Sequence, residues 1–314
     1  MLNIGIIGPG RVAERHAIAL KSISNAQLWS VAGRTLDNAK AFTEKHQPSA
    51  CIYDNLHEML NDPELHAVII ATPDNLHAEQ IILSATAGKA ILVEKPVCTS
   101  LEAGQSMLAT MAKHPTFLTV GYHLRWHQGF RFIAQKAQNN ELGEIHHIKL
   151  RWGVNFIDHA KWRLDPVYGR WCCLSALGTH LIDLVRWILL PTCGEVVKQS
   201  SKVQYVANTN IDGAVEISMQ FESGAVADIF CSLTDDEPLS LEIDTKDASV
   251  KGDNLAGSIE HRKLTINNNV FSFSETNVYV EQINAFVQTI KNNLQPEVTL
   301  EEGLKNVAHL IEIK

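Results

Sequence analysis

The sequence is poor in the features that mark fibrous, secreted or membrane proteins. Its 314 residues contain 18 glycines and 10 prolines, too few for a low-complexity or collagen-like chain. The six cysteines form no C-x-x-C pair and have no zinc-ligand spacing, which predicts reduced thiols in a cytoplasmic protein. No apolar run approaches the ~20 residues that cross a bilayer, and the first residues lack the pattern of a signal peptide. We therefore expect no membrane partner.

Positive charge is also in short supply. Lys and Arg number 27 against 35 Asp and Glu, which gives a formal net charge of −8. Because an acidic surface repels phosphate backbones, we expect no nucleic-acid partner, although local basic pockets remain compatible with this balance. Hydrophobic residues make up 45% and charged residues 20%, as in ordinary globular proteins, and the length suggests two domains.

The first part of the chain alternates short apolar runs with helical patterns. Runs that are apolar on both faces are typical of parallel strands covered by helices on both sides. This alternation predicts an α/β fold with a doubly wound, Rossmann-type parallel sheet. The strands are expected at residues 2–7, 27–32, 67–71, 90–93 and 117–120.

After about residue 122 the pattern changes to strands with few helices between them. Several alternate polar and apolar residues, which favours a mostly antiparallel sheet with one packed face and one open face. These strands are expected at residues 145–152, 197–206, 214–221, 225–233, 240–245 and 263–266. Two helices close the chain, and the second opens with the capping box Thr299-Leu300-Glu301-Glu302. We predict a Rossmann domain over 1–122 and an α+β domain over 123–314, and the closing helices could pack back on the first domain.

A glycine-rich loop follows the first predicted strand. Gly8-Pro9-Gly10-Arg11-Val12-Ala13 fits the pattern G-x-G-x-x-G/A and opens the first predicted helix. The first glycine allows a tight turn, the second lets the backbone approach a pyrophosphate, and the helix N-terminus faces the anion. The loop predicts a dinucleotide site with cofactor contacts from Gly8, Gly10, Arg11 and Val12.

The residues after the second strand bear on which nucleotide is bound. An NAD-binding site usually has Asp or Glu there to bond the ribose hydroxyl, but this chain has Gly33-Arg34-Thr35. Arg34 can pair with a 2′-phosphate and Thr35 can offer a hydroxyl. We predict NADP(H) as the cofactor, with NAD(H) as the second choice. The alternative interpretation of Arg34 is a solvated turn residue.

Further motifs carry a family resemblance. Ala71-Thr72-Pro73-Asp74-Asn75-Leu76-His77 and Glu94-Lys95-Pro96 each follow a predicted strand, and Trp162-Arg163 and Gly178-Thr179-His180-Leu181-Ile182-Asp183 lie in the second half. With the glycine loop, these segments resemble the Gfo/Idh/MocA oxidoreductases, the group that contains glucose–fructose oxidoreductase and inositol dehydrogenases. The resemblance implies hydride exchange between a nicotinamide and a hydroxyl-bearing carbon of a sugar-like or cyclitol-like substrate. It also implies a dimer or tetramer formed through the open sheet face. The further cofactor contacts that it implies are Ala71, Thr72, Pro73, Asn75, His77, Glu94, Lys95, Trp162 and Arg163.

Lys95 is the candidate acid/base. An alcohol releases a hydride only as its hydroxyl proton leaves, so a base must lie beside the nicotinamide. Ligands of open α/β sheets bind beyond the carboxyl ends of the strands, where Lys95 is expected. Partial burial and a cationic nicotinamide would disfavour the ammonium form of Lys95 and lower its pKa. The alternative is a surface lysine that pairs with Glu94.

His180 is the second catalytic candidate. It shares a helix face with Asp183, and the resemblance implies that it faces the substrate and relays a proton or binds the reacting hydroxyl. A buried core histidine is the alternative. His123 and His127 have helical spacing but no third ligand, so we expect no metal site. The candidate substrate-binding residues are Lys95, His123, Arg125, Arg163, Thr179, His180 and Asp183.

One residue departs from the family pattern. Members similar to inositol dehydrogenase usually carry an aspartate four residues before the histidine, where this chain has Ala176. The departure leaves two hypotheses open. The first is an oxidoreductase that prefers NADP(H) and acts on a sugar, nucleotide-sugar or cyclitol-like substrate. The second is a catalytically weak regulatory protein of the same fold that binds a nicotinamide nucleotide.

Overall fold

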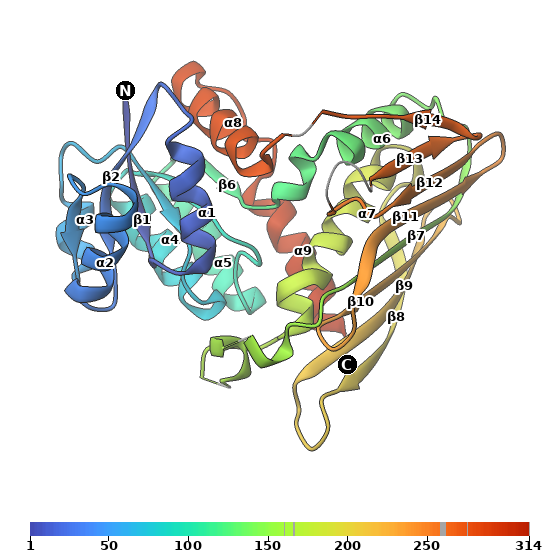
Figure 1. Ribbon diagram of the computed structural model, residues 1–314, viewed down its shortest axis with the longest axis horizontal. Coiled ribbons are helices and arrows are strands. Elements are labelled where there is room, and N and C mark those ends of the chain that lie inside the picture. The colour runs from blue at the N-terminus through green and yellow to red at the C-terminus, as the bar shows by residue number, and fades with distance from the viewer. Residues whose placement is uncertain (160, 166, 258–261, 275, 314) are drawn as a thin grey trace. The chain divides into compact units, whose positions relative to one another are not determined.

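The chain folds into two compact units. The computed structural model describes residues 1–159, 161–165, 167–257, 262–274 and 276–313 (Figure 1). The first unit comprises Met1–His123 and Asn277–Val307, and the second comprises Leu124–Thr276 and Ala308–Lys314. The segment after residue 276 therefore folds with the N-terminal residues over most of its length.

The first unit is built on a six-stranded sheet in which every pair of neighbours is parallel. The strand order β3-β2-β1-β4-β5-β6 reverses direction between β1 and β4, as in a doubly wound fold. The predicted fold class is confirmed, although the short β3 was not expected. The strands are β1 (Leu2–Ile7), β2 (Ala26–Ala32), β3 (Cys51–Tyr53), β4 (Ala67–Ile70), β5 (Ala90–Val93) and β6 (Leu118–Val120).

Helices cover both faces of this sheet. Ala13, Phe42 and Phe286 belong to one apolar cluster with strand residues such as Ile4 and Ile69, so α1, α2 and α8 lie on one face. All residues of β4 and β5 are buried, which requires cover on the other face as well. Since each buried aliphatic side chain contributes about 1.5–3 kcal/mol, this two-sided burial accounts for much of the stability of the unit. The helices of this unit are α1 (Arg11–Leu20), α2 (Leu36–His46), α3 (Leu56–Leu60), α4 (His77–Thr86), α5 (Leu101–Lys113), α8 (Val278–Asn292) and the part of α9 (Leu300–Glu312) up to Val307.

Two predicted helix starts are confirmed. The Thr35 hydroxyl accepts a hydrogen bond from the amide of Asn38, at 3.3 Å, and so caps α2. At α9, the amide of Thr299 donates to Glu302 Oε2 at 3.1 Å and the amide of Glu302 donates to Thr299 Oγ1 at 3.3 Å. This reciprocal pair is the predicted capping box.

The second unit is built on an eight-stranded sheet with the order β14-β13-β12-β11-β7-β10-β9-β8. Neighbours are antiparallel except for β7 and β10, so the prediction of a mostly antiparallel sheet is confirmed. The short strands β12 and β14 were not expected. The strands are β7 (Ile145–Gly153), β8 (Val196–Tyr205), β9 (Asp212–Phe221), β10 (Val226–Ser232), β11 (Glu237–Thr245), β12 (Ser249–Asp253), β13 (Lys263–Ile266) and β14 (Asn269–Phe271).

The two faces of this second sheet differ. Helices α6 (Gln128–Gln138) and α7 (Thr179–Cys193) pack together, and α7 packs on β7 and β10 (Figure 1). On the other face, a hollow of about 400 Å³ is lined by alternate polar residues of β7–β10, including Arg151, Lys202, Glu216 and Asp228. Among the described segments, no helix covers this face.

The helix that carries His180 is anchored at its start. A π-helical turn, Leu174–Gly178, runs directly into α7. Asp212 at the start of β9 accepts hydrogen bonds from the amides of Cys172 at 2.6 Å and Leu174 at 2.8 Å. The stretch Leu174–Cys193 is long and apolar enough for a membrane span, with a mean hydropathy of 1.2 over its most apolar 18 residues. However, 78% of that window is buried inside the protein, as in the core helix of a globular fold.

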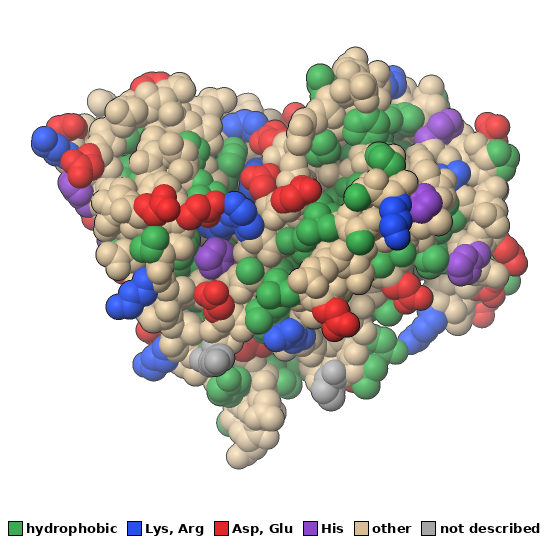
Figure 2. Space-filling model, turned by 180° about the vertical axis from the view of Figure 1, so that it is seen from behind, with side chains coloured by type: hydrophobic (Ala, Val, Ile, Leu, Met, Phe, Trp, Pro, Cys, Tyr) green, Lys and Arg blue, Asp and Glu red, His purple; other side chains and the backbone are tan. Residues whose placement is uncertain are grey.

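Charged side chains of both signs are mixed on the surface. Lys and Arg side chains lie singly or in small groups among Asp and Glu on the face that Figure 2 shows. Within the described part of the chain, that face has no extended cationic surface.

Candidate active site

The glycine loop has the geometry that a dinucleotide phosphate requires. Gly8 follows β1 with a φ of +89°, and a Cβ there would lie 2.6 Å from Thr72 Cγ2. Glycine is therefore favoured at this position by its conformation and by the close approach of the next loop. A Cβ on Gly10 would meet nothing within 4 Å, so the space over the first amides of α1 is open. These amides form the positive end of the helix and can bind an anion.

Arg34 follows β2 immediately, at the same edge of the sheet. Its side chain is exposed and has no ion-pair partner among the described residues. Thr35 is also exposed, and its oxygen caps α2. The end of β2 therefore presents a guanidinium and a hydroxyl where an NAD-binding site would have a carboxylate.

His77 links the two loops that follow β4 and β5. Its Nδ1 lies 2.8 Å from the carbonyl oxygen of Pro96 and its Nε2 lies 2.9 Å from that of Thr72. The His77 side chain is fully buried. The structure shows His77 bonded to both loops, and its predicted contact with the cofactor stays a prediction.

Lys95 lies at the carboxyl end of β5 and is 8% exposed. Its neighbour Glu94 is 4% exposed, and Glu94 Oε1 lies 2.8 Å from Nε2 of the fully buried His16. Burial raises the pKa of Glu94, but the hydrogen bond from His16 and the positive charge of Lys95 outweigh it and bring the pKa to about 2. Glu94 is therefore a buried carboxylate at neutral pH.

His123 and Tyr279 form a stacked pair of rings in the same unit. Their rings stack with centroids 4.7 Å apart, and the Tyr279 ring meets the His16 ring edge-on at 5.2 Å. Burial, assisted by the charges of Lys95 and Arg15, lowers the pKa of His123 to about 3, against the opposing effect of Glu94. His123 is therefore neutral at physiological pH.

The sequence analysis missed His16 and Tyr279. His16 lies on the same helix face as the buried Ala13, Ala17 and Leu20, so a polar side chain on an apolar stripe was the available signal. Tyr279 starts the buried stripe of α8, but it is far from Glu94 in the sequence and nothing local pairs the two.

His180 lies in the first turn of α7 and is 3% exposed. Its ring centroid is 6.2 Å from that of Trp152, which comes from β7. Thr179 beside it is fully buried. Ala176 is half-buried in the π-helical turn before α7.

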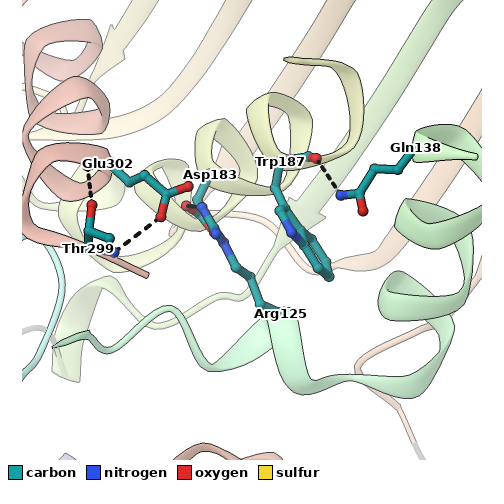
Figure 3. Close-up of polar contacts among 6 residues, drawn as sticks. All are labelled: Arg125, Gln138, Asp183, Trp187, Thr299 and Glu302. Atoms are coloured by element: carbon teal, nitrogen blue, oxygen red, sulfur yellow. Dashed lines mark hydrogen bonds and ion pairs between the residues drawn. The ribbon is translucent and has the colours of Figure 1, made fainter. Parts of the chain in front are cut away.

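Arg125 and Asp183 bind each other (Figure 3). Arg125 Nε donates to Asp183 Oδ2 at 2.8 Å, and Nη2 donates to Oδ1 at 2.7 Å. The residues are only 2% and 1% exposed, and the guanidinium lies 5.5 Å from the ring centroid of Trp187. The structure shows that each binds the other, and their predicted role in substrate binding stays a prediction. Whether Asp183 also orients His180 stays a prediction.

Trp162 and Arg163 are half-buried in a short helical turn. The Arg163 guanidinium lies 4.2 Å from the Trp162 ring centroid, and Arg163 Nε donates to Ser175 Oγ at 3.3 Å. Arg163 thereby contacts the segment that contains Ala176. His127 accepts a hydrogen bond from the amide of Phe130 at the start of α6, and the described residues include no group of three side chains suited to a metal ion.

The predicted site residues divide between the two units. In the first unit, the carboxyl ends of parallel strands gather the cofactor candidates at one sheet edge. In the second unit, α7 and the turns around residues 125, 163 and 176 hold the remaining candidates. The first group is Gly8, Gly10, Arg11, Val12, Arg34, Thr35, Ala71, Thr72, Pro73, Asn75, His77, Glu94, Lys95 and His123.

A Rossmann-type unit and a mostly antiparallel sheet unit together define a dinucleotide-binding oxidoreductase class. Residues 2–122 match the oxidoreductase family with an NAD-binding Rossmann fold, and residues 130–251 match the GFO/IDH/MocA C-terminal domain. The chain belongs to the Gfo/Idh/MocA oxidoreductase family.

Two relatives and one solved structure illustrate the range of the family. Glucose-6-phosphate 3-dehydrogenase of Bacillus subtilis (strain 168) is 29% identical over 258 residues, which cover 77% of this chain and 72% of that protein. Myo-inositol 2-dehydrogenase of Thermotoga maritima is 24% identical over 315 residues, which cover 96% of this chain and 92% of that protein. Levoglucosan dehydrogenase in complex with NADH has the same fold, with a TM-score of 0.85 at 17% identity over 99% of this chain and 96% of the other.

The buried pair of Arg125 and Asp183 leads to a stability prediction. Replacing Arg125 by Met or Asp183 by Leu leaves one buried charge without its partner and should lower the free energy of unfolding by about 3–5 kcal/mol. The double replacement Arg125→Met/Asp183→Leu removes both charges and should cost less than the sum of the single changes. Urea unfolding followed by Trp fluorescence measures all three, and additive losses would contradict a coupled pair.

The low pKa of His123 leads to a pH prediction. The pKa of His123 in the folded protein lies below the ordinary value of 6.5. Its contribution to the free energy of unfolding is therefore fully present above pH 6.5 and is lost as the pH falls. In His123→Phe, which keeps a ring against Tyr279, the free energy of unfolding should fall less steeply between about pH 6 and 4, by at most about 1.4 kcal/mol per pH unit. Urea unfolding over a pH series tests this, and equal slopes for the two proteins would count against it.

Proposed function

We propose that the protein transfers a hydride between NADP(H) and a hydroxyl-bearing carbon of a sugar, nucleotide-sugar or cyclitol-like substrate. One observation carries the proposal. Lys95 stands at the carboxyl end of β5, held between the buried Glu94 on one side and the His77-bound Pro96 on the other. The glycine loop lies at the same edge of the same sheet.

The chemistry follows from these groups. When bound, the nicotinamide supplies the acceptor or donor of the hydride. Lys95 Nζ takes the hydroxyl proton during oxidation and returns it during reduction, as general acid–base catalysis requires. An imidazole nitrogen of His180 binds the reacting hydroxyl and relays the proton. The amides at the start of α1 hold the pyrophosphate.

Arg34 supports NADP(H) as the preferred cofactor. It is exposed directly after β2, and a 2′-phosphate would give it a charge-assisted partner of matching geometry. The preceding residue, Gly33, has no side chain to crowd this turn, where a Cβ would lie 3.0 Å from the carbonyl oxygen of Thr35. Levoglucosan dehydrogenase was solved with NADH, which keeps NAD(H) as the second candidate.

The remaining assignments extend this proposal. The first unit is the NAD(P)-binding domain, and the second binds substrate and forms a dimer or tetramer through the open face of its sheet. The relatives that act on glucose 6-phosphate and myo-inositol support a small polyol or sugar-like substrate. None of the six cysteines forms a disulfide, which fits a cytoplasmic location.

Replacing Arg34 by Ala tests the choice of cofactor. If Arg34 pairs with the 2′-phosphate, Arg34→Ala should weaken NADPH binding by about 10- to 100-fold, because a hydrogen-bonded charge contributes about 1.5–3 kcal/mol. NADH binding should change little. Titration of each nucleotide against intrinsic fluorescence measures both dissociation constants.

Lys21→Ala is the matched control. Lys21 is exposed at the far end of α1, so its loss removes one positive charge from the same unit without touching the end of β2. It should leave the binding of both nucleotides unchanged. Tighter binding of NADH than of NADPH by the unaltered protein would overturn the NADP preference.

Replacing Lys95 by Met tests the catalytic role. The methionine keeps an unbranched side chain but removes the amine, so turnover should fall by ~10²-fold or more while NADPH binding remains. Absorbance of the reduced nicotinamide measures turnover. Turnover near that of the unaltered protein would remove Lys95 from the mechanism.

A substrate screen separates the enzyme from the regulatory alternative, which the absence of a carboxylate at Ala176 favours. Oxidation of any member of a panel of sugars, sugar phosphates, nucleotide-sugars and cyclitols with NADP⁺ supports the enzyme. Nucleotide binding with no turnover across the panel supports a regulatory protein instead.

A further inference from the structure

His16 of α1 is the hydrogen-bond partner of Glu94 Oε1 among the described residues. Its contacts indicate which ring nitrogen carries the proton. Its Nε2 lies 2.8 Å from Glu94 Oε1, while its Nδ1 is buried with no hydrogen-bond partner among the described residues. A neutral imidazole has one N–H, and the bond to the carboxylate uses it. An imidazolium would bury a second N–H without an acceptor. His16 therefore donates its Nε2–H to Glu94 and orients the carboxylate.

The charge on Glu94 needs a cation nearby. Three other polar or ionisable groups interact with its charge: Lys95 from the end of β5, His123 from the segment after β6 and Tyr279 from α8. Arg15 from α1 lies beside Tyr279. His123 is neutral, and the Arg15 guanidinium lies 5.7 Å from the Tyr279 ring centroid. A buried carboxylate without a counter-ion is costly, so Lys95 is the group that balances it.

We propose that His16 is a positioning residue for catalysis. It holds Glu94 in place as the counter-ion of Lys95, and Glu94 thereby sets the pH at which Lys95 changes from ammonium to amine. The inference rests on the proposed acid/base role of Lys95 and deepens it. The competing interpretation is structural, in which the His16–Glu94 bond only packs α1 against the end of β5. The two differ in whether changes at His16 reach the charge of Lys95.

The pH midpoint of Lys95 can be measured without a substrate. Competitive labelling with acetic anhydride over a pH series reports the fraction of each lysine present as amine. Lys95 precedes a proline, where trypsin does not cleave, so residues 90–113 are released as one peptide in which mass spectrometry locates the label. The exposed Lys251 serves as the internal reference.

Glu94→Gln is the first variant. It keeps the shape of the side chain and removes the negative charge, so the midpoint of Lys95 should fall by about one pH unit or more, the usual effect of a close opposite charge. Glu14→Gln is the matched control, since it makes the same change on the exposed surface of α1, where Glu14 pairs with Lys45. It should leave the midpoint of Lys95 unchanged.

His16 is tested by a cycle of variants. His16→Phe keeps a ring but removes the donor, so the carboxylate of Glu94 is no longer held in place. The midpoint of Lys95 should then fall in the same direction by a smaller amount. His16→Gln restores an N–H donor and should return the midpoint toward that of the unaltered protein. In the Glu94→Gln background, His16→Phe should cause no further change, because its effect passes through Glu94.

The outcomes are separable. An unchanged midpoint in folded Glu94→Gln, or independent additive shifts from the two positions, overturns the inference in favour of the structural interpretation. Thermal unfolding of each variant verifies that it is folded. If the midpoints shift as expected but no substrate is turned over, the electrostatic assignment stands and the proposed function fails. If turnover is found while the midpoints do not move, the proposed function stands and the electrostatic assignment fails.

Discussion

The arrangement of the first unit depends on one buried negative charge. Glu94 is 4% exposed, yet its hydrogen bond from His16 and the neighbouring charge of Lys95 keep it ionised. Such a group is stable only where its partners are fixed. Its hydrogen-bond partner His16 comes from α1, and the Tyr279 ring of α8 lies against the His16 ring and stacks on His123 after β6. Three distant parts of the chain therefore meet near the end of β5.

Two different devices hold the proposed catalytic side chains in their units. Around Lys95, the loops after β4 and β5 are joined by His77, whose two ring nitrogens meet two backbone carbonyls. Around His180, the start of the helix is held by Asp212, and its next turn is held by the ion pair of Asp183 with Arg125. In both places a buried polar side chain fixes backbone or a helix, while the proposed chemistry belongs to a different side chain, Lys95 or His180.

Much of the fold could be predicted because its signals are local. The parallel strands of the first sheet are apolar throughout, and the helix caps at Thr35 and Thr299 depend on residues within one turn. The short strands β3, β12 and β14 carry little apolar pattern and form by pairing with longer neighbours. The site was harder to predict. Motifs indicated Lys95 and His180, but partners such as His16 for Glu94 and Arg125 for Asp183 are 78 and 58 residues apart and follow only from tertiary packing.

The discontinuous make-up of the first unit has a consequence for synthesis. One face of its sheet is closed by Tyr279, Ile283 and Phe286, which leave the ribosome long after the strands that they cover. Until then, a nascent chain that carries the whole parallel sheet still exposes an apolar surface. Such a surface is prone to aggregation, so the N-terminal unit should need protection by chaperones until nearly the full chain has emerged.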